Sequence, residues 1–492
     1  MRQVPGLIAT VVLSLGLCAG CSAPAPPADA GISTSSGSRA AADAATAVRT
    51  IPAAASVPAA GAAASVRPAA ATLFRNVRIF DGHSAELSAP SHVLVRGNLI
   101  ERISREAIDL QPDGDVTIID GDGRTLMPGL IDAHWHAMLA AVPMGVMMTA
   151  DVGYLNLVAA DEAEQTLLRG FTSVRDMAGP VFGLKRAIDE GVTVGPRIWP
   201  SGAMISQTGG HGDFRFSYEV PRTPNSPLSH VEAIGAGIVA DGADQVLLRA
   251  REQLMLGASQ LKLAAGGGVA SAHDPLDVSQ YTEAEIHAAV EAARKWGTYV
   301  TVHAYTPEAI QTAIRAGVKC IEHGQLMDEA TARLMAEKGV WLSIQPFLDD
   351  QDAFPFPEGS SSRAKQVAML SGTDTAYRLA RKYQVKTAWG TDTLFDPKLA
   401  RREGAQLAKM VRWYAPAAIL TMATSNNAEL LALSGPRNPY PGKLGVVEQG
   451  ALADLLLVDG NPIADIRLVA DPAKNFVVIM KDGKVYKNLL AR

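Results

Sequence analysis

Two histidines separated by one residue stand at the end of GLIDAHWH, residues 129–136. Alternate residues of a β-strand point to the same face, so we expect His134 and His136 to point one way and Trp135 the other. Imidazole nitrogens are the commonest protein ligands for zinc and similar metals. The pair therefore predicts part of a metal site, and the remaining ligands must come from elsewhere in the chain.

Further side chains of this kind follow at the ends of later apolar stretches. They are Lys262, His303, His323 and Asp392. Each has a structural interpretation when taken alone, because a single histidine is often a hydrogen-bonded core residue and an aspartate can cap a helix. A lysine can likewise be an ordinary ion-pair partner. Six such groups at five strand ends, in chain order, together predict a metal site.

The middle of the chain, residues 126–436, alternates short apolar stretches with amphipathic helical ones. The candidate strands are GLIDAHWH, FTSVRD, RIWPSG, SQLKLAA, TYVTVHA, KCIEHG, VWLSIQP and KTAWGTD. Helical periodicity marks stretches such as TEAEIHAAVEAARKWG and TPEAIQTAIRAG. The pattern predicts an α/β fold, a (β/α)8 TIM barrel. A doubly wound sheet is the alternative, but no Gly-rich dinucleotide fingerprint follows the first strand.

Both ends of the predicted folded region are rich in short β-strands. The stretches are TLFRNVRIF, HVLVRG, LIERIS and VTIID at one end, and ADLLLVDG and FVVIMKDGKVYK at the other. Gly97-Asn98 and Asp482-Gly483 are typical hairpin turns. We expect residues 72–125 and 437–492 to form one small β-sandwich domain.

The N-terminal segment predicts export and no folded domain. Residues 1–20 carry one early positive charge, an apolar stretch too short to span a bilayer, and small residues, as a signal peptide does. LCAGC resembles a bacterial lipobox, which implies lipid on Cys21, with a plain secretory signal as the alternative. Residues 21–71 are mostly Ala, Pro, Ser and Gly and predict a disordered linker. We expect a periplasmic protein, lipid-anchored to the outer membrane of a bacterium.

The overall composition excludes other classes. A net charge of −5 over 492 residues, with 19% charged residues, shows no basic excess, so no nucleic-acid partner is expected. Two of the three cysteines lie in the N-terminal segment, so no disulfide framework is expected.

The order of the metal-competent groups resembles the amidohydrolase superfamily in its binuclear, metal-dependent subtype. The sequence motifs typical of this superfamily are matched over about residues 72–492. The matching stretches are GLIDAHWH, GFTSVRD, HAYT, IEHG, WGTD and GALADLLLVDGNP. SGAMISQTGGHGD and KLAAGGG resemble its prolidase-like branch, which includes Xaa-Pro and Xaa-Arg/Lys dipeptidases and enzymes that hydrolyse ochratoxin A.

The resemblance implies two divalent metal ions, usually zinc. It assigns His134, His136 and Asp392 to one ion, and His303 and His323 to the other. Lys262 would bridge both as N6-carboxylysine, the carbamate formed with CO2, because an ammonium group has no lone pair for a metal. Two ions roughly 3.5–4 Å apart lower the pKa of a bridging water, so that hydroxide forms near neutral pH. Asp392 can then pass a proton to the departing amine as general acid–base.

The predicted reaction is hydrolysis of the amide bond of a small N-acyl amino acid or dipeptide, with ochratoxin A among the candidates. The free carboxylate of such a substrate needs a cation or hydrogen-bond donors. His211, in GGHGD, is the first candidate for a catalytic contact with substrate or oxyanion, and Tyr305 could bond the same group. Arg175 and Arg215 are weaker candidates. A pair with Asp176 suits Arg175 better, and a solvated loop position suits Arg215 better.

Two long segments, 203–258 and 346–385, interrupt the alternation of strands and helices. The second could form part of a lid over the barrel mouth. The methionines at 138, 144, 147 and 148 could line an apolar pocket, but packing against a helix is the favoured interpretation.

The sequence allows three alternatives to amide hydrolysis to be compared with it. A deaminase of this superfamily lacks the bridging lysine and carries a glutamate where this chain has Thr306, which argues against it. An ester or lactone hydrolase with the same metals stays open, since the same attack serves either carbonyl. A non-catalytic binding protein should have lost ligands, and all six are present here. Relatives of this kind commonly form oligomers, so we expect a homo-oligomer.

Overall fold

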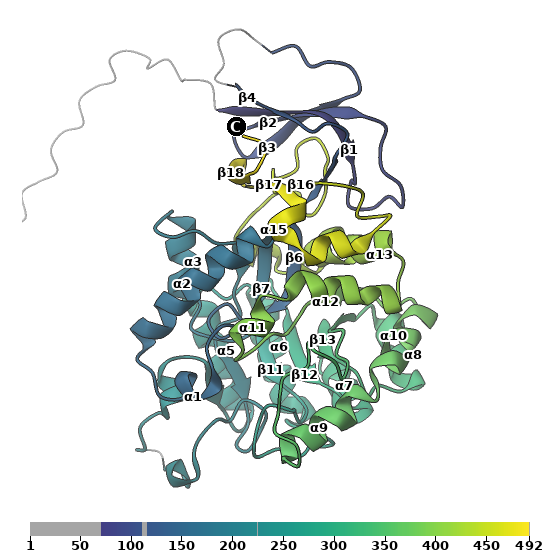
Figure 1. Ribbon diagram of the computed structural model, residues 1–492. Coiled ribbons are helices and arrows are strands. Elements are labelled where there is room, and N and C mark those ends of the chain that lie inside the picture. The colour runs from purple at the N-terminus through teal and green to yellow at the C-terminus, as the bar shows by residue number, and fades with distance from the viewer. Residues whose placement is uncertain (1–69, 111–115, 224, 492) are drawn as a thin grey trace, which may run out of the picture. The chain divides into compact units, whose positions relative to one another are not determined.

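The structure is a computed structural model that describes residues 70–110, 116–223 and 225–491 (Figure 1). The predicted signal peptide, Cys21 and nearly all of the predicted linker lie outside these ranges and stay predictions. Within them, no helix is both long enough and apolar enough to cross a membrane.

Strands from both ends of the described chain join in one eight-stranded sheet. They are β1 (Ala71–Ile79), β2 (Ser91–Arg96), β3 (Leu99–Ser104), β4 (Val116–Asp120), β5 (Thr125–Pro128), β16 (Leu455–Val458), β17 (Phe476–Lys481) and β18 (Lys484–Asn488). Their order is β18–β17–β16–β5–β1–β2–β3, and β4 pairs with β1. β5 lies between β1 and β16, so it connects the two ends of the described chain. The domain boundary predicted at 125/126 therefore falls inside a strand of this sheet.

The middle of the chain contains parallel strands, including all those that the sequence predicted. They are β6 (Leu130–Trp135), β7 (Phe171–Asp176), β8 (Arg197–Trp199), β9 (Met204–Ser206), β10 (Gly237–Val239), β11 (Leu261–Ala264), β12 (Val300–Ala304), β13 (Cys320–His323), β14 (Trp341–Ile344) and β15 (Thr387–Trp389). β9 and β10 come from the long segment 203–258. Strand pairing gives one sheet, β10–β9–β11–β12–β13–β14–β15, and a second, β6–β7–β8. The fold is thus α/β, as predicted, but among the described residues no strand ladder joins β8 to β9 or β15 to β6.

Helices alternate with these strands (Figure 1). The longer ones are α2 (Val152–Leu168), α3 (Phe182–Asp189), α5 (Ala243–Leu256), α6 (Glu283–Lys295), α7 (Pro307–Arg315), α8 (Glu329–Lys338), α9 (Ser361–Leu370) and α10 (Thr373–Lys382). Shorter ones are α1 (Met144–Met147), α4 (His230–Ala233), α11 (Pro397–Ala400), α12 (Glu403–Lys409), α13 (Pro416–Thr421), α14 (Asn427–Ala432) and α15 (Pro472–Asn475). Local sequence fixes their ends: Thr282 and Glu285 form a capping box at the start of α6, and Pro307 is the first residue of α7. The two helices predicted from TEAEIHAAVEAARKWG and TPEAIQTAIRAG are confirmed as α6 and α7.

A buried asparagine links β15 to β6 where the ladder is missing. Asn427 Nδ2 donates to the carbonyl oxygens of Ile131 (2.7 Å) and Trp389 (2.8 Å), and its Oδ1 accepts from the Trp389 N–H (3.0 Å). Further along, the Asp392 N–H donates to the His134 carbonyl (2.8 Å). These bonds hold the first and last predicted barrel strands side by side where their functional residues stand.

Candidate active site

The six predicted metal-site residues line one cavity. His134 and His136 come from the end of β6, Lys262 from β11, His303 from β12, His323 from β13, and Asp392 from the loop after β15. Asp392 Oδ1 lies 3.1 Å from His134 Nε2 and 3.0 Å from His136 Nε2, and its Oδ2 lies 3.9 Å from His323 Nδ1. The rings of His303 and His323 are 4.4 Å apart. The structure therefore brings all six residues together.

Hydrogen bonds decide which nitrogen of three histidines is free for a metal. The bonds are His134 Nδ1 to Glu322 Oε2 (2.8 Å), His303 Nε2 to the Gly267 carbonyl (3.0 Å) and His323 Nδ1 to Gln345 Oε1 (2.7 Å). Carboxylate and carbonyl oxygens only accept, so each of these nitrogens carries the proton. The other nitrogen of the His303 and His323 rings keeps its lone pair, whereas His134 Nε2 faces the Asp392 carboxylate at 3.1 Å. Acceptors of this kind behind metal-binding imidazoles fix the ring orientation.

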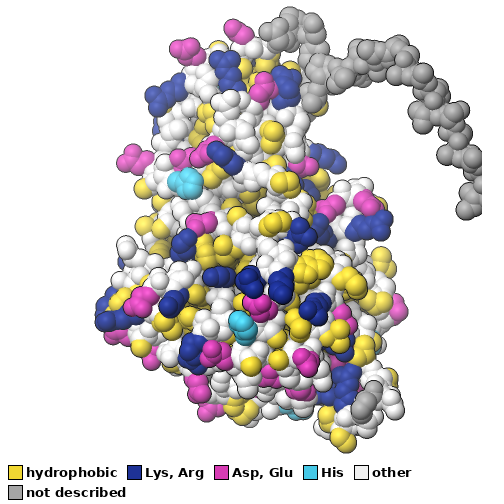
Figure 2. All heavy atoms as spheres, turned by 180° about the vertical axis from the view of Figure 1, so that it is seen from behind, with side chains coloured by type: hydrophobic (Ala, Val, Ile, Leu, Met, Phe, Trp, Pro, Cys, Tyr) yellow, Lys and Arg dark blue, Asp and Glu magenta, His cyan; other side chains and the backbone are white. Residues whose placement is uncertain are grey.

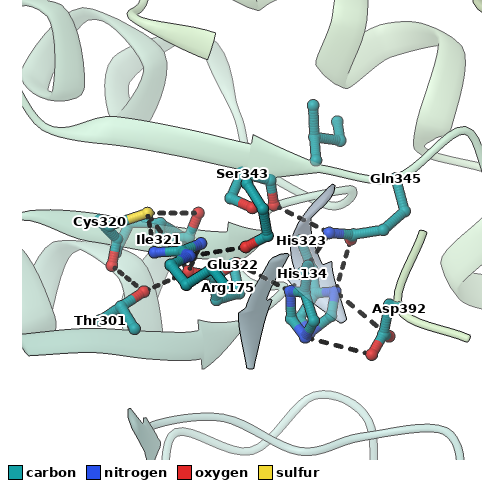
Figure 3. Close-up of polar contacts among 12 residues, drawn as sticks. His134, Arg175, Thr301, Cys320, Ile321, Glu322, His323, Ser343, Gln345 and Asp392 are labelled. Carbon is teal, nitrogen blue, oxygen red and sulfur yellow. Dashed lines mark hydrogen bonds and ion pairs between the residues drawn. The ribbon is translucent and has the colours of Figure 1, made fainter. Parts of the chain in front are cut away.

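Glu322 is in turn held by a buried arginine (Figure 3). Arg175 Nη2 donates to Glu322 Oε1 over 2.7 Å, and both side chains are wholly buried. Burial alone would raise the pKa of Glu322, but attraction to Arg175 and His134 holds it well below its usual value. The predicted Arg175–Asp176 pair is wrong, because Asp176 accepts a backbone N–H instead.

The backbone departs from regular strand geometry at two of the predicted ligand positions, His323 and Asp392. Glu322 and His323 are neighbours, so strand alternation alone would send them to opposite faces. Both nevertheless meet His134, whose ring lies 5.0 Å from that of His323. His323 and Asp392 have left-handed φ values of 81° and 53°, a strained conformation typical of functional sites. Gly390 lets the chain after β15 approach β6 closely, because a Cβ at residue 390 would lie only 2.5 Å from the backbone nitrogen of His134.

Lys262 occupies an environment that disfavours its ammonium form. Its side chain is 2% exposed and lines the cavity. Burial, partly offset by the attraction of Glu322 and Asp392, lowers the pKa of Lys262 to about 8. A neutral lysine amine is the form that can react with CO2, so this position fits the carbamate that the family resemblance implies.

The donor set fits divalent metal ions. His134, His323 and Asp392 each offer a ligand atom within 4.8 Å of the others. His136 Nδ1 is buried and has no hydrogen-bond partner among the described residues. Imidazole nitrogens and a carboxylate at this spacing suit zinc and similar ions.

The walls of the cavity are strongly apolar. Its phenylalanines are Phe214, Phe347, Phe354, Phe356 and Phe395. Three of them come from the segment 346–385, which the sequence predicted as part of a lid. Met144 and Met147 also line the cavity. The methionines at 138 and 147 belong to an apolar cluster with Trp135, and those at 144 and 148 pack against it. The two long segments therefore supply four of the five phenylalanines that line the cavity.

Charged groups are few on these walls. Within the described part of the chain, Lys262 is the only lysine or arginine that lines the cavity. Asp352 also lines it, but its carboxylate pairs with Arg402 and, at 2.8 Å, with Lys409. Asp352 is therefore already neutralised and offers little to a basic substrate side chain.

His211 and Tyr305 lie in the cavity as predicted candidates for substrate contact. The His211 ring stacks on His303 at 4.0 Å, and the Tyr305 ring lies 4.8 Å from His303. Burial lowers the pKa of His211 to about 4. Arg215 lies outside the cavity lining and is bound to Asp213 at 2.6 Å. Both interpretations of Arg215 are wrong, since it is buried and its guanidinium is occupied.

Several residues that support this site were not among the predicted site residues. They are Glu322, Gln345, Ser271 and Asp274. Glu322 stands inside the quoted stretch IEHG, and a charged residue in a short apolar strand is the signal that could have found it.

A comparison with protein families agrees with the fold and the site described above. Residues 125–488 match the amidohydrolase family, which is most of the chain. The chain belongs to the amidohydrolase family and is a hydrolase that acts on amide or other C–N bonds.

Similar proteins narrow the branch within this family. Ochratoxinase from Aspergillus niger is 31% identical over 383 residues, covering 74% of this chain and 75% of that protein. The crystal structure of a prolidase in complex with N-methylphosphonate-L-proline is 34% identical, with a TM-score of 0.77, covering 85% of this chain and 100% of that one. A Xaa-Pro dipeptidase structure with bound methionine is 30% identical, with a TM-score of 0.73, covering 85% and 100%. The predicted prolidase-like branch is confirmed.

Proposed function

We propose that this chain hydrolyses the amide bond between an apolar acyl group and an amino acid with a bulky apolar side chain. One observation carries the proposal: a cluster of metal-competent side chains lies in a cavity whose walls are phenylalanine and methionine. Burying a side chain of the size of phenylalanine stabilises a complex by about 1.5–3 kcal/mol. N-acyl phenylalanines, with ochratoxin A among them, have this chemistry, and ochratoxinase is similar to the chain.

The chain would hold two divalent ions, for which zinc suits the donors. The ligands would be His134, His136 and Asp392 for one ion and His303 and His323 for the other, with carbamylated Lys262 between them. When bound, such a pair supplies a water of lowered pKa and polarises the substrate carbonyl. The free nitrogens of His303 and His323 and the lowered pKa of Lys262 support this assignment.

Asp392 would move the proton in this reaction. Its carboxylate takes a proton from the attacking water and gives it to the nitrogen of the leaving amine, so the amide bond breaks into a carboxylic acid and an amine. Burial alone would raise the pKa of Asp392, but the neighbouring imidazoles hold it well below its usual value. His211 and Tyr305 are the polar side chains best placed to orient the rest of the substrate.

Hydrolysis of a matched substrate panel tests the proposal. The panel holds the acyl group constant and varies the amine side as phenylalanine, arginine and proline, with the methyl ester of the acyl acid as a probe for ester hydrolysis. We expect kcat/KM for the phenylalanine amide to exceed that for the arginine amide at least about tenfold, since a guanidinium would lose water against apolar walls. A preference for arginine would contradict the proposed apolar specificity, and hydrolysis of the ester alone would contradict amide hydrolysis.

A further inference from the structure

The loop after β11 surrounds His211 with a closed set of hydrogen bonds. Ser271 Oγ lies 2.8 Å from His211 Nδ1 and donates to Asp274 Oδ1. Ser271 and Asp274 are only 1% and 3% exposed. Gln280 accepts the His211 backbone N–H (3.0 Å) and donates to Asp274 Oδ2 (3.2 Å), which completes the ring of contacts.

The chemistry of these groups fixes the direction of the bond to His211. Asp274 Oδ2 accepts from the Gly268 N–H (2.7 Å) as well as from Gln280, so both carboxylate oxygens act as acceptors. The single hydroxyl proton of Ser271 therefore goes to Asp274, because its other acceptor, the Gly268 carbonyl, is 3.5 Å away. Ser271 Oγ is then an acceptor toward His211, and His211 Nδ1 must carry the proton.

Two further features hold this loop against the histidine. A Cβ on Gly268 would lie 1.9 Å from His211 Nδ1, so only glycine allows the approach. Lys365, in α9, donates to the carbonyl oxygens of Ser271 (2.6 Å) and Asp274 (3.1 Å). The loop is therefore anchored to the segment that also supplies the phenylalanine wall.

We propose that Ser271 and Asp274 are positioning residues that keep His211 in its Nδ1-protonated tautomer and leave its Nε2 for the substrate. With Nδ1 bound to Ser271, Nε2 is the polar atom that His211 presents to the cavity. In this tautomer Nε2 accepts a hydrogen bond, so it suits a substrate N–H or O–H and not the predicted oxyanion contact. The tautomer follows from the loop alone, whereas its effect on turnover rests on the proposed function.

Asp274→Asn tests the tautomer without changing the shape of the side chain. The bonds from Gly268 and Gln280 would keep the amide oxygen at the position of Oδ2, so the amide nitrogen would face Ser271 and donate to it. The Ser271 hydroxyl would then donate to His211 Nδ1 and move the ring proton to Nε2. Nitrogen-15 NMR of the ¹⁵N-histidine holoenzyme, with the His211 signal identified by its loss in His211→Asn, should show protonated Nδ1 in the wild type and protonated Nε2 in Asp274→Asn.

Turnover gives a second readout. We expect Ser271→Ala to lower kcat/KM for an N-acyl phenylalanine about tenfold, in line with one lost orienting hydrogen bond, with metal content unchanged. The same substitution in a His211→Asn background should have no further effect, because the two residues act as one unit. Thr208→Val is the matched control. Thr208 stands in the same loop as His211, and its hydroxyl donates to Asp241 (2.7 Å) without contacting the His211 ring. It should leave kcat/KM unchanged.

The outcomes separate this inference from the proposed function. A wild-type His211 protonated on Nε2, or equal losses from Ser271→Ala with and without His211, would overturn the positioning role. A wild type with the Nδ1 tautomer that hydrolyses no amide in the panel would support the positioning geometry and refute the proposed function instead.

Discussion

Glu322→Gln removes one charge from a wholly buried series of contacts while keeping the side chain's shape. In the native chain Glu322 accepts from Arg175 Nη2 at 2.7 Å and from His134 Nδ1 at 2.8 Å. Removing one partner of a buried ion pair costs roughly 3–5 kcal/mol, because the other charge stays buried without compensation. The glutamine oxygen can still accept one of the two bonds, so we expect a loss of about 3 kcal/mol in the free energy of unfolding.

The same substitution should weaken metal binding. An amide is a poorer acceptor than a carboxylate for the His134 Nδ1–H, and losing such a partner behind a metal ligand typically costs about 10–100-fold in metal affinity. Competition with a chromophoric chelator measures this affinity, and urea unfolding measures the stability.

Glu403→Gln is the control. Glu403 is also wholly buried and accepts from Arg169 at 2.6 Å, but Arg169 has a second acidic partner in Glu162. This variant should keep wild-type metal affinity whatever its stability. If Glu322→Gln bound metal as tightly as the wild type, the reasoning that Glu322 orients His134 would be refuted.

The contribution of Glu322 to stability should depend on pH with a definite sign. Its pKa lies well below the ordinary 4.5 in the folded chain, so the folded state keeps the charge where the unfolded state begins to bind a proton. The contribution is complete above about 4.5 and disappears as pH falls through the folded pKa. The stability difference between wild type and Glu322→Gln should therefore shrink in acid, and a difference that grows in acid would contradict the low pKa.

Three further predictions concern the cavity. Lys262→Ala should lose most bound metal and activity, with partial rescue by short carboxylic acids that replace the carbamate; full turnover without them would contradict its bridging role. Because burial lowers the pKa of Lys262 to about 8, the rate at which zinc and a constant concentration of dissolved CO2 reactivate the metal-free protein should rise with pH up to about 8 and then level off. A rate still climbing toward pH 10 would indicate an unperturbed lysine. Phe347→Ala should raise KM for N-acyl phenylalanines about tenfold and leave kcat and metal content unchanged, because it removes apolar contact area but no metal ligand. An unchanged KM would show that the substrate does not contact this wall of the cavity.

Much of the framework could be predicted because short-range patterns carry it. Period-two alternation placed His134 and His136 on one face, and the helix around residues 283–295 follows from its capping box and periodicity. The meeting of residues 71–128 and 455–488 in one sheet follows from β-rich stretches with clear turn residues in both regions. These signals lie within a few residues of the structures that they specify.

The rest depends on contacts between distant segments. Arg175 was paired with its sequence neighbour, but its real partner, Glu322, is 147 residues away. Strand alternation could not predict that Glu322 and His323 both contact His134, because the left-handed backbone at His323 breaks the alternation. The Ser271–His211 bond likewise joins two loops whose approach depends on tertiary packing.

The metal content of the purified full-length chain tests the central claim most directly. Elemental analysis would be paired with hydrolysis of an N-acyl phenylalanine in the protein as isolated, after chelation, and after zinc and bicarbonate are returned. We predict about two divalent ions per chain, with activity that disappears and returns with them. Full-rate hydrolysis by a chain that holds no divalent metal would contradict the proposed mechanism.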